Sequence, residues 1–328
     1  MLRQRVITAA VLLVILVAVL AAPGPIPFAV LLAVFAVLAM IEWWRLTLAR
    51  AAVPGGAPAA SWRELLLLGD TGARLVLRIV ATLFGCWLFV RLLLDYSVLA
   101  APLGALILDS AGSAVLGFGT PGWVEMMQRI TAVAWLWALF GWLAVSVYLF
   151  FARVERAPFS VLLSAFGLLA VPAACTALLV AYGRGVPYLL SLLAVVWAAD
   201  IGAYFVGRRV GGRKLAPAIS PGKTLSGAIG GMVCAIAWVL ASAALAQPTP
   251  TGYSLFGADL VARWSWPGAA LFGAVLAWVS IAGDLFESLL KRRAGRKDSS
   301  QLLPGHGGVF DRIDAVLPTA PLAMLLVL

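Results

Sequence analysis

Residues 267–314 read PGAALFGAVLAWVSIAGDLFESLL and then KRRAGRKDSSQLLPGHGGVFDRID, and they contain the two features that decide the fold. The first 24 residues form an apolar run of the length that crosses a bilayer as a helix, about 20 residues. Residues 284–314, by contrast, contain five acids, six bases and the only histidine of the chain. Charge is costly in or beside a bilayer, so this concentration indicates a functional site.

The composition of the whole chain is typical of a membrane protein. Of its 328 residues, 63% are hydrophobic and 12% are charged, and the mean hydropathy is +1.03. Soluble domains are about one quarter charged. The net charge of +10 comes from bases at the ends of apolar runs, where membrane topology and anionic lipids explain them. This placement argues against nucleic acid as a partner.

Nine apolar runs are long enough to cross about 30 Å of hydrocarbon as helices, so we expect an all-α polytopic membrane protein. The first run is interpreted as a signal anchor rather than a cleaved signal peptide, because a second run begins almost at once. The broken apolar stretch 97–128 is either a re-entrant or interfacial segment or a tenth span. The expected spans are 5–22, 25–42, 73–95, 130–152, 159–182, 186–206, 225–247, 267–290 and 312–328.

The distribution of basic residues predicts the orientation of these spans. Most of the 24 lysine and arginine residues fall on one side of the membrane when the N-terminus is cytoplasmic and the C-terminus is outside. In this topology, the charged stretch faces the cytoplasm. The polar groups that could carry chemistry gather after residue 195. We therefore expect an N-terminal transmembrane scaffold over 1–185 and a C-terminal catalytic region over 186–328.

A glycine-rich, basic loop follows the sixth expected span and ends in Ser220-Pro-Gly-Lys223-Thr224. Glycine lets backbone N–H groups approach an oxyanion closely, and the N-terminus of the following helix favours anions. The loop is therefore either a phosphate cradle, to which Arg208 also belongs, or a basic loop that only fixes topology. A P-loop is excluded because that motif's first glycine is missing here and no strand is expected before the loop.

Asp284, Ser288 and Lys291 are spaced i, i+4 and i+7, so they share one face at the end of the eighth expected span. Asp311 and Asp314 follow where the ninth span begins. These two acids are either helix caps or partners of Asp284 across a pair of antiparallel helices. Carboxylates beside many bases suit Mg²⁺ together with a polyphosphate.

His306 stands between these two groups in the turn Leu-Pro-Gly-His-Gly-Gly. The glycines of this turn permit conformations that bring the backbone close to a ligand. The histidine is an acid/base group, a hydrogen-bond donor to phosphate or a donor that braces the turn, and the residues themselves do not rank these three roles.

The charged stretch resembles the signature of phosphatidate cytidylyltransferases, also called CDP-diacylglycerol synthases. The resemblance covers about residues 195–318, and the N-terminal half is similar to that family only in its hydrophobic character. Ser226 is a departure, because many members carry an acid or amide there. The matching positions are Ser288-x-x-Lys291-Arg292, Lys297-Asp298-x-Ser300, Leu303-Pro304-x-His306-Gly307-Gly308-Val309, Asp311-Arg312-Ile313-Asp314, Asp200-x-x-Ala-Tyr204-x-x-Gly207-Arg208 and Ser220-Pro221-x-Lys223-Thr224.

The resemblance implies a homodimeric enzyme of a bacterial-type inner membrane, with its active site facing the cytoplasm. It implies CTP and phosphatidate as substrates, CDP-diacylglycerol and pyrophosphate as products, and Mg²⁺ as cofactor, with a second cation as a further option. Asp284 and Asp311 would bind the metal. The residues implied at the catalytic centre are Ser288, Lys291, His306, Asp311 and Asp314, and the substrate-binding residues are Arg208, Ser220, Lys223, Thr224, Arg292, Lys297 and Arg312.

Two alternatives remain open from the residues. The first is another CTP-dependent enzyme that acts on a different membrane alcohol or phosphate, such as a polyprenol kinase. The second is a transporter that uses Asp200 and Asp284 as intramembrane carboxylates. The clustering of charge at one membrane face, and the lack of a visible inverted repeat, argue against a transporter.

Overall fold

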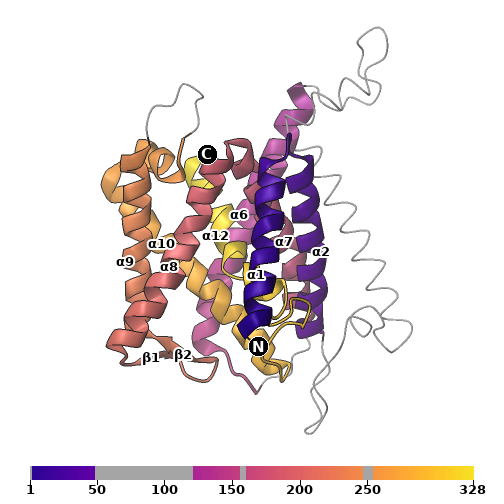
Figure 1. Cartoon of the computed structure of the whole chain (residues 1–328), viewed down its shortest axis with the longest axis vertical. Coiled ribbons are helices and arrows are strands. Elements are labelled where there is room, and N and C mark those ends of the chain that lie inside the picture. The colour runs from indigo at the N-terminus through magenta and orange to yellow at the C-terminus, as the bar shows by residue number, and fades with distance from the viewer. Residues whose placement is uncertain (1, 49–120, 156–159, 247–253) are drawn as a thin grey trace, which may run out of the picture.

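The computed structural model describes residues 2–48, 121–155, 160–246 and 254–328, which form a bundle of helices with one short hairpin (Figure 1). Its elements are α1 (Leu2–Ala21), α2 (Ile26–Thr47), α6 (Pro121–Phe151), α7 (Val161–Gly183), α8 (Val186–Val210), β1 (Lys214–Ala216), β2 (Ser220–Thr224), α9 (Leu225–Leu245), α10 (Phe256–Arg293), α11 (Phe310–Ile313) and α12 (Val316–Val327).

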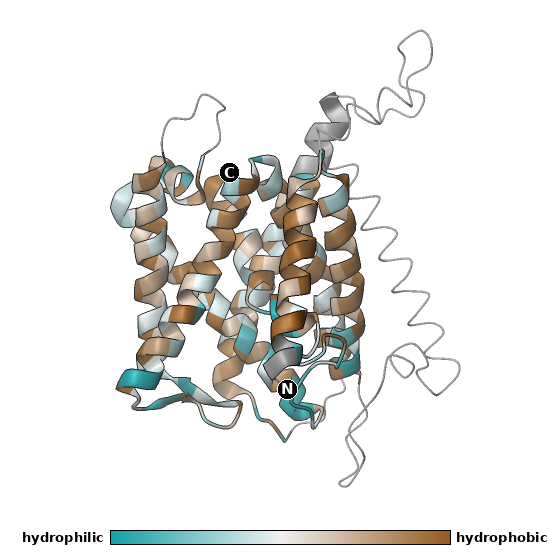
Figure 2. Ribbon diagram, viewed as in Figure 1, coloured by the Kyte–Doolittle hydropathy of each residue, from teal (hydrophilic) through white to brown (hydrophobic). Residues whose placement is uncertain are grey.

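Six of the described helices, α2 and α6 to α10, are long and apolar enough to cross a membrane, and α1 carries a shorter apolar stretch, Val6–Ala21. These helices confirm the prediction of a multi-pass membrane protein. The expected span 73–95 and most of the stretch 97–128 lie outside the described residues. Polar residues gather at the end of the bundle that carries the hairpin and the N-terminus (Figure 2).

The expectation of an all-α chain needs one correction, because β1 and β2 form an antiparallel hairpin. Helix α8 ends at Gly211, and Gly211 and Gly212 have φ values of 65° and 95°, which only glycine adopts at low cost. The chain turns back there, and the Leu225 N–H donates to the Arg213 carbonyl at 2.9 Å. The basic loop expected before α9 is therefore an ordered hairpin.

The expected span 312–328 is also corrected, because the chain there is broken at Asp314 into α11 and α12. Helix α12 has 12 residues, which corresponds to a rise of about 18 Å, well short of the hydrocarbon thickness. It packs against α6, α7, α8 and α10, and most of its side chains are buried. The two termini nevertheless lie at opposite ends of the bundle (Figure 1).

Small residues allow α8, α9 and α10 to pack closely, which is common between membrane helices. A Cβ on Gly231 of α9 would stand 2.6 Å from the Ala199 carbonyl oxygen of α8, and one on Gly227 would stand 2.8 Å from the Ala203 carbonyl oxygen. This contact fixes α9, and the hairpin that precedes it, against α8. The hairpin is therefore held beside the last turns of α10, where the charged stretch begins.

Candidate active site

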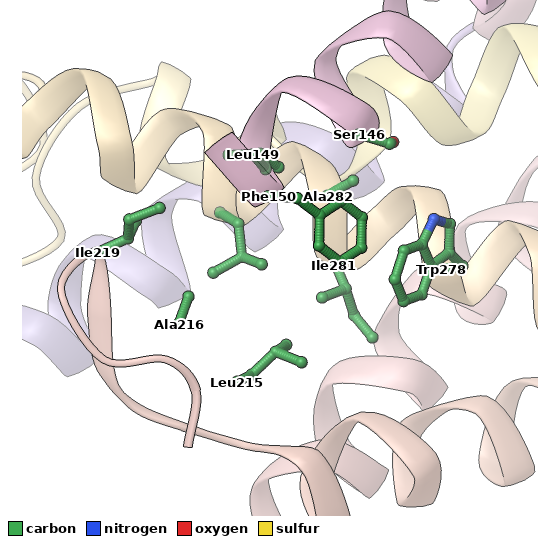
Figure 3. A pocket seen from close by; sticks show the side chains of 10 residues that line it. Ser146, Leu149, Phe150, Leu215, Ala216, Ile219, Trp278, Ile281 and Ala282 are labelled. Atoms are coloured by element: carbon green, nitrogen blue, oxygen red, sulfur yellow. The ribbon is translucent and has the colours of Figure 1, made fainter. Parts of the chain in front are cut away.

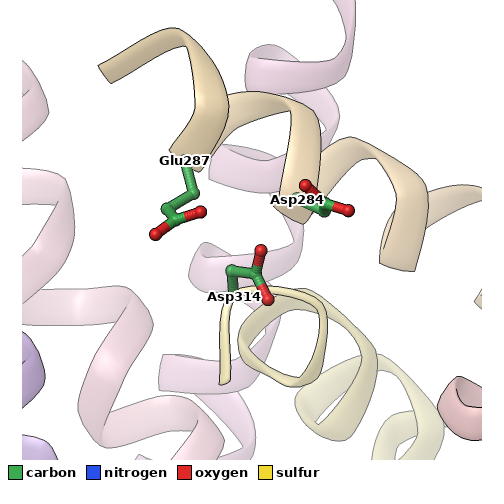
Figure 4. Close-up of side chains that lie close together, drawn as sticks. All are labelled: Asp284, Glu287 and Asp314. Carbon is green, nitrogen blue, oxygen red and sulfur yellow. The ribbon is translucent and has the colours of Figure 1, made fainter. Parts of the chain in front are cut away.

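Three carboxylates meet where α10 passes the start of α12. Asp284, Glu287 and Asp314 each offer an oxygen, and these oxygens lie within 4.8 Å of one another. Figure 4 shows Asp284 and Glu287 projecting from α10 toward Asp314 on the facing segment. We call these three residues the acidic cluster. Hard oxygen ligands at such separations suit a Mg²⁺ ion.

Close approach of the backbone brings Asp314 to α10. Gly283 precedes Asp284, and a Cβ at this position would collide with the Asp314 carbonyl oxygen and would lie 2.9 Å from Pro318. Only glycine lets the two segments approach this closely. The break between α11 and α12 also leaves the Asp314 side chain free to face α10, and one of its oxygens accepts the Ala315 N–H at 2.8 Å.

Two lysines from different elements border the acidic cluster. Lys223 of β2 lies 2.5 Å from Asp284, and Lys291 of α10 lies 2.6 Å from Glu287. The other Glu287 oxygen, Oε1, is buried and has no hydrogen-bond partner among the described residues. Burial, followed by the charge of Asp284, raises the pKa of Asp314. Three ionised carboxylates at these separations repel one another, and a divalent cation between them would offset this repulsion.

The hairpin positions Lys223. Thr224, the last residue of β2, caps α9 by accepting the Gly227 N–H on its hydroxyl oxygen at 3.1 Å. The Ser226 hydroxyl donates to the Gly211 carbonyl at the base of the hairpin, so Ser226 has a structural contact. From the α10 side, Arg292 donates to the Ile219 carbonyl at 3.4 Å. These contacts hold the hairpin so that Lys223 reaches Asp284.

Asp311 lies beside the acidic cluster, but its carboxylate already accepts hydrogen bonds from four groups. The donors are Lys291 Nζ at 2.7 Å, the Ser299 N–H at 3.0 Å, the Ser299 hydroxyl at 2.8 Å and the Gly308 N–H at 2.7 Å. Burial would raise the pKa of Asp311, but interactions with the Glu287 and Lys291 side chains and with the Gly308 N–H lower it to about 2. Its role as a metal ligand stays a prediction.

Glu42 of α2 takes part in the same network, although the sequence analysis did not single it out. Its side chain is fully buried and accepts hydrogen bonds from Ser300, Val309 and Phe310, and the Ser299 hydroxyl lies 3.0 Å from it. An acid inside an otherwise apolar span is a functional-site signal in itself, so the sequence did carry a pointer to it. Its partners, more than 250 positions further along the chain, could not be inferred from spacing.

His306 and its neighbours form a tight turn in which Leu303 pairs with Gly307. The His306 N–H donates to the Leu303 carbonyl at 2.8 Å, and the His306 carbonyl accepts two N–H groups of Arg312. Its imidazole Nδ1 is buried and has no hydrogen-bond partner among the described residues. The backbone of His306 thus braces the turn, and the role of its ring stays a prediction.

The remaining predicted site residues lie at different distances from the acidic cluster. Ser288 donates to Asp284 at 3.4 Å, a weak hydrogen bond. Arg208 and Lys297 are exposed, and Arg208 donates to Tyr204. In the described part of the chain, ion pairs join only Lys223 and Lys291 to the acids of this region. Among the described residues, the three carboxylates of the acidic cluster form no hydrogen bond or ion pair with the other predicted residues, which are Ser220, Arg208, Arg292, Lys297 and Arg312.

An apolar pocket lies along α10 and the hairpin, the two elements that also carry Asp284 and Lys223 (Figure 3). Leu285, which follows Asp284, lines it together with Ile281, Ala282 and Trp278 from the same helix. The spacing of these residues places them on one face of α10. The rest of the wall comes from α6 and from the hairpin, through Ser146, Leu149, Phe150, Leu215, Ala216 and Ile219.

The fold and the site thus define a multi-pass membrane protein with acidic and basic groups gathered at one end of its helix bundle. Residues 3–328 match the profile of the cytidylyltransferase family, and the chain belongs to this family. The match extends over the N-terminal half, which the sequence motifs alone do not reach.

Curated relatives agree with this assignment. A phosphatidate cytidylyltransferase of Brucella suis is 48% identical over 141 residues, which cover 43% of this chain and 47% of that protein. One of Haemophilus influenzae is 45% identical over 42% of this chain and 44% of its own length. One of Staphylococcus aureus is 32% identical over 63% of this chain and 72% of its own length. The chain thus spans less than half the length of the first two relatives.

Proposed function

We propose that this chain is a phosphatidate cytidylyltransferase, which converts CTP and phosphatidate into CDP-diacylglycerol and pyrophosphate. The observation that carries the proposal is one arrangement: α10 and the hairpin carry two of the three clustered carboxylates and both lysines, and the same two elements line an apolar pocket. A nucleoside triphosphate needs the charged groups, and a lipid needs the pocket. Membership of the cytidylyltransferase family and the names of the curated relatives support the same reaction.

The acidic cluster fits Mg²⁺, because its three oxygens are hard ligands within 4.8 Å of one another and Glu287 Oε1 has no partner among the described residues. We propose Asp284, Glu287 and Asp314 as its ligands. The ion would offset negative charge on the triphosphate of CTP. Metal binding to variants tests whether Asp311 is also a ligand and whether a second cation binds.

The transfer itself requires little covalent help from the protein. A phosphate oxygen of phosphatidate attacks the α-phosphorus of CTP, the bond from that phosphorus to the bridging oxygen breaks, and pyrophosphate leaves with the electron pair. A phosphate monoester is anionic at neutral pH, so no general base has to remove a proton. Positioning and electrostatic stabilisation therefore dominate catalysis.

Lys223 and Lys291 are the residues that we propose to stabilise the phosphates. Each is an ion-pair partner of the acidic cluster and is 26% or less exposed, so its charge acts in a poorly solvated site. A divalent cation held by these carboxylates would free Lys223 from Asp284 and Lys291 from Glu287 to face phosphate oxygens, while Asp311 would still position Lys291. Ser288 would orient Asp284, and the exposed bases would attract the anionic substrates. Those bases are Arg208, Arg292, Lys297 and Arg312.

The apolar pocket is the part of the site that we assign to the lipid. Its wall of Leu285, Ile281 and Trp278 lies on α10, the helix that carries Asp284 and Glu287, and its opposite wall comes from the hairpin that carries Lys223. An acyl chain seated there leaves the phosphatidate headgroup beside the cluster. A soluble nucleotide can reach the same place only from the aqueous side.

We further propose nine membrane segments: the six long helices, α1, the expected span 73–95 and the short helix α12, which lies inside the bundle and does not cross the hydrocarbon by itself. The N-terminus and the site would face the cytoplasm of a bacterial-type inner membrane, with the C-terminus outside. We also propose a homodimer, and a division of labour between a scaffold over 1–185 and a catalytic region over 186–328. Labelling of single cysteines by a membrane-impermeant reagent, at Lys214 and at Arg263 separately, tests the orientation.

A reaction of the purified protein tests the function. CTP labelled at the α-phosphate is incubated with Mg²⁺ and a panel of phosphatidate, diacylglycerol and polyprenol. We expect a labelled CDP-lipid and pyrophosphate with phosphatidate alone. Release of labelled CDP with a phosphorylated alcohol would make the protein a lipid kinase and contradict the proposal. Absence of turnover with every lipid would contradict it as well.

A further inference from the structure

Glu42 lies in α2, in the half of the chain that the motifs do not reach, and it contacts the segment that leads into the site. Its side chain has no exposed surface. The Ser300 hydroxyl donates to Oε1 at 2.6 Å, and the Val309 N–H donates to the same oxygen at 3.2 Å. The Phe310 N–H donates to Oε2 at 2.7 Å, and the Ser299 hydroxyl lies 3.0 Å from it. Ser300, Val309 and Phe310 therefore each donate a hydrogen bond to this carboxylate.

These contacts continue into the site through Asp311. The Ser299 hydroxyl lies between two carboxylates, 3.0 Å from Glu42 and 2.8 Å from Asp311. Asp311 also accepts the backbone N–H groups of Ser299 and Gly308, which belong to the segment that Glu42 holds. At 2.7 Å, Asp311 then fixes the ammonium group of Lys291. A chain of contacts thus runs from α2 to a lysine beside the acidic cluster.

The packing around Gly308 shows that this arrangement leaves no room for adjustment. A Cβ at Gly308 would collide with the Ser299 hydroxyl oxygen and with Glu42 Oε2. The segment must therefore pass close to the glutamate for its N–H groups to reach both carboxylates. A displacement of the segment by one ångström would move Asp311 and Lys291 together.

We propose that Glu42 is a positioning residue for the transfer reaction: through residues 299–310 it sets the positions of Asp311 and Lys291. This inference rests on the proposed function, because that function gives Lys291 its role in stabilising the phosphates. It adds that the N-terminal region supplies a part of the site, where the sequence led us to expect a scaffold only.

The substitution Glu42→Gln tests this inference, because both side-chain oxygens of Glu42 must accept hydrogen bonds. Each Glu42 oxygen accepts one backbone N–H, from Val309 or from Phe310, and a backbone N–H cannot rotate away. In either orientation, the amide NH₂ of Glu42→Gln faces one of these donors, which leaves a buried donor unsatisfied. Glu42→Asp keeps the charge but is shorter by one methylene, so it restores one oxygen contact at most.

The matched control is Thr47→Val in the same helix. Thr47 is buried like Glu42, and its hydroxyl bonds to the Trp43 carbonyl and to Ser164 of α7, away from residues 299–310. This variant weakens the packing of α2 without touching the segment. We expect its turnover, normalised to folded protein, to stay within about twofold of wild type.

Kinetics and proteolysis together decide the inference. In Glu42→Gln we expect kcat to fall about 10- to 100-fold with KM for phosphatidate changed less than about threefold, because small misplacements cost about this much. Trypsin should cleave folded protein after Lys297 at least about tenfold faster than in wild type, whereas Thr47→Val should not change this rate. The cleavage rate does not depend on catalysis, so it tests whether Glu42 holds residues 299–310 in place even if the proposed reaction is wrong.

A double-mutant comparison separates positioning from general destabilisation. If Glu42 acts through Lys291, adding Glu42→Gln to Lys291→Met should lower kcat by less than about threefold beyond Lys291→Met alone. Multiplicative losses in the double mutant would overturn the inference. Wild-type turnover and wild-type proteolysis of Glu42→Gln would overturn it too, while leaving the proposed function intact.

Discussion

Asp311 and Asp314 lie one helical turn apart, but their surroundings are opposite. Asp311 accepts hydrogen bonds from four donors and, together with Glu42, organises residues 299–310. Asp314 accepts one backbone N–H and faces the carboxylates of Asp284 and Glu287. A carboxylate that is saturated with donors has a structural task, whereas carboxylates that face one another are available for a cation. The signature of the family contains both kinds of acid and does not distinguish them.

The largest effect should follow from breaking the acidic cluster. We expect Asp284→Asn and Asp314→Asn each to lower turnover at least about 1000-fold, because each removes a proposed ligand of the metal. Neither should reduce the thermal stability in the presence of a chelator, because each also removes repulsion between like charges. Asp259→Asn is the matched control: Asp259 pairs with Arg184 at 2.8 Å, far from the cluster, and its turnover should stay within about twofold. Near-normal turnover of either cluster variant at saturating Mg²⁺ would contradict the metal assignment.

Asp311→Asn should combine a loss of activity with a loss of stability. An amide at this position leaves buried donors of Ser299 and Gly308 without an acceptor, and it breaks the ion pair with Lys291. The expected costs are about 100-fold in turnover and about 2–4 kcal/mol in the free energy of unfolding. Thermal unfolding in detergent, measured beside the kinetics, checks both. A fully active and stable variant would show that the saturated carboxylate does not organise the site.

The substitution Lys223→Met tests the role of a basic residue that borders the acidic cluster. The ammonium group borders Asp284 and becomes available to phosphate once a cation occupies the cluster. We expect KM for CTP to rise about tenfold, with a smaller change in kcat. Lys214→Met on the exposed start of the same hairpin is the control and should leave KM within about twofold. Equal effects of both substitutions would indicate a general electrostatic role instead.

Ser288→Ala should have the smallest effect of the series. Its hydroxyl donates to Asp284 over 3.4 Å, which is a weak contact. We expect turnover to fall by less than about tenfold, because the acidic cluster keeps its three carboxylates. A loss as large as that of Asp284→Asn would mean that Ser288 contacts the substrates directly.

Hydropathy was sufficient to predict the six long helices, because burial in a bilayer is recorded locally in runs of apolar residues. The spacing of Asp284, Ser288 and Lys291 likewise placed them on one helical face, and the contact of Ser288 with Asp284 agrees with this. The approach of Asp314 to Asp284 matches the expected pairing of two antiparallel segments.

Features that depend on distant contacts could not be predicted in this way. Gly211 and Gly212 end α8 and lead the chain into the hairpin, and the sequence showed them only as part of a glycine-rich loop. Residues 312–328 were expected to form one span. The helix is broken at Asp314, and this break directs the Asp314 side chain toward α10. Glu42 meets Phe310 across 268 positions, a pairing that no local pattern encodes.

The distinction between Asp314 as a metal ligand and Asp311 as a structural carboxylate is tested most directly by metal binding in the absence of nucleotide. Purified wild-type protein, Asp311→Asn and Asp314→Asn are titrated with Mn²⁺, and bound ion is counted by electron paramagnetic resonance on the folded fraction. We expect wild type and Asp311→Asn to bind Mn²⁺ and Asp314→Asn to lose at least about tenfold in affinity. Retention of Mn²⁺ by Asp314→Asn together with its loss in Asp311→Asn would contradict this account.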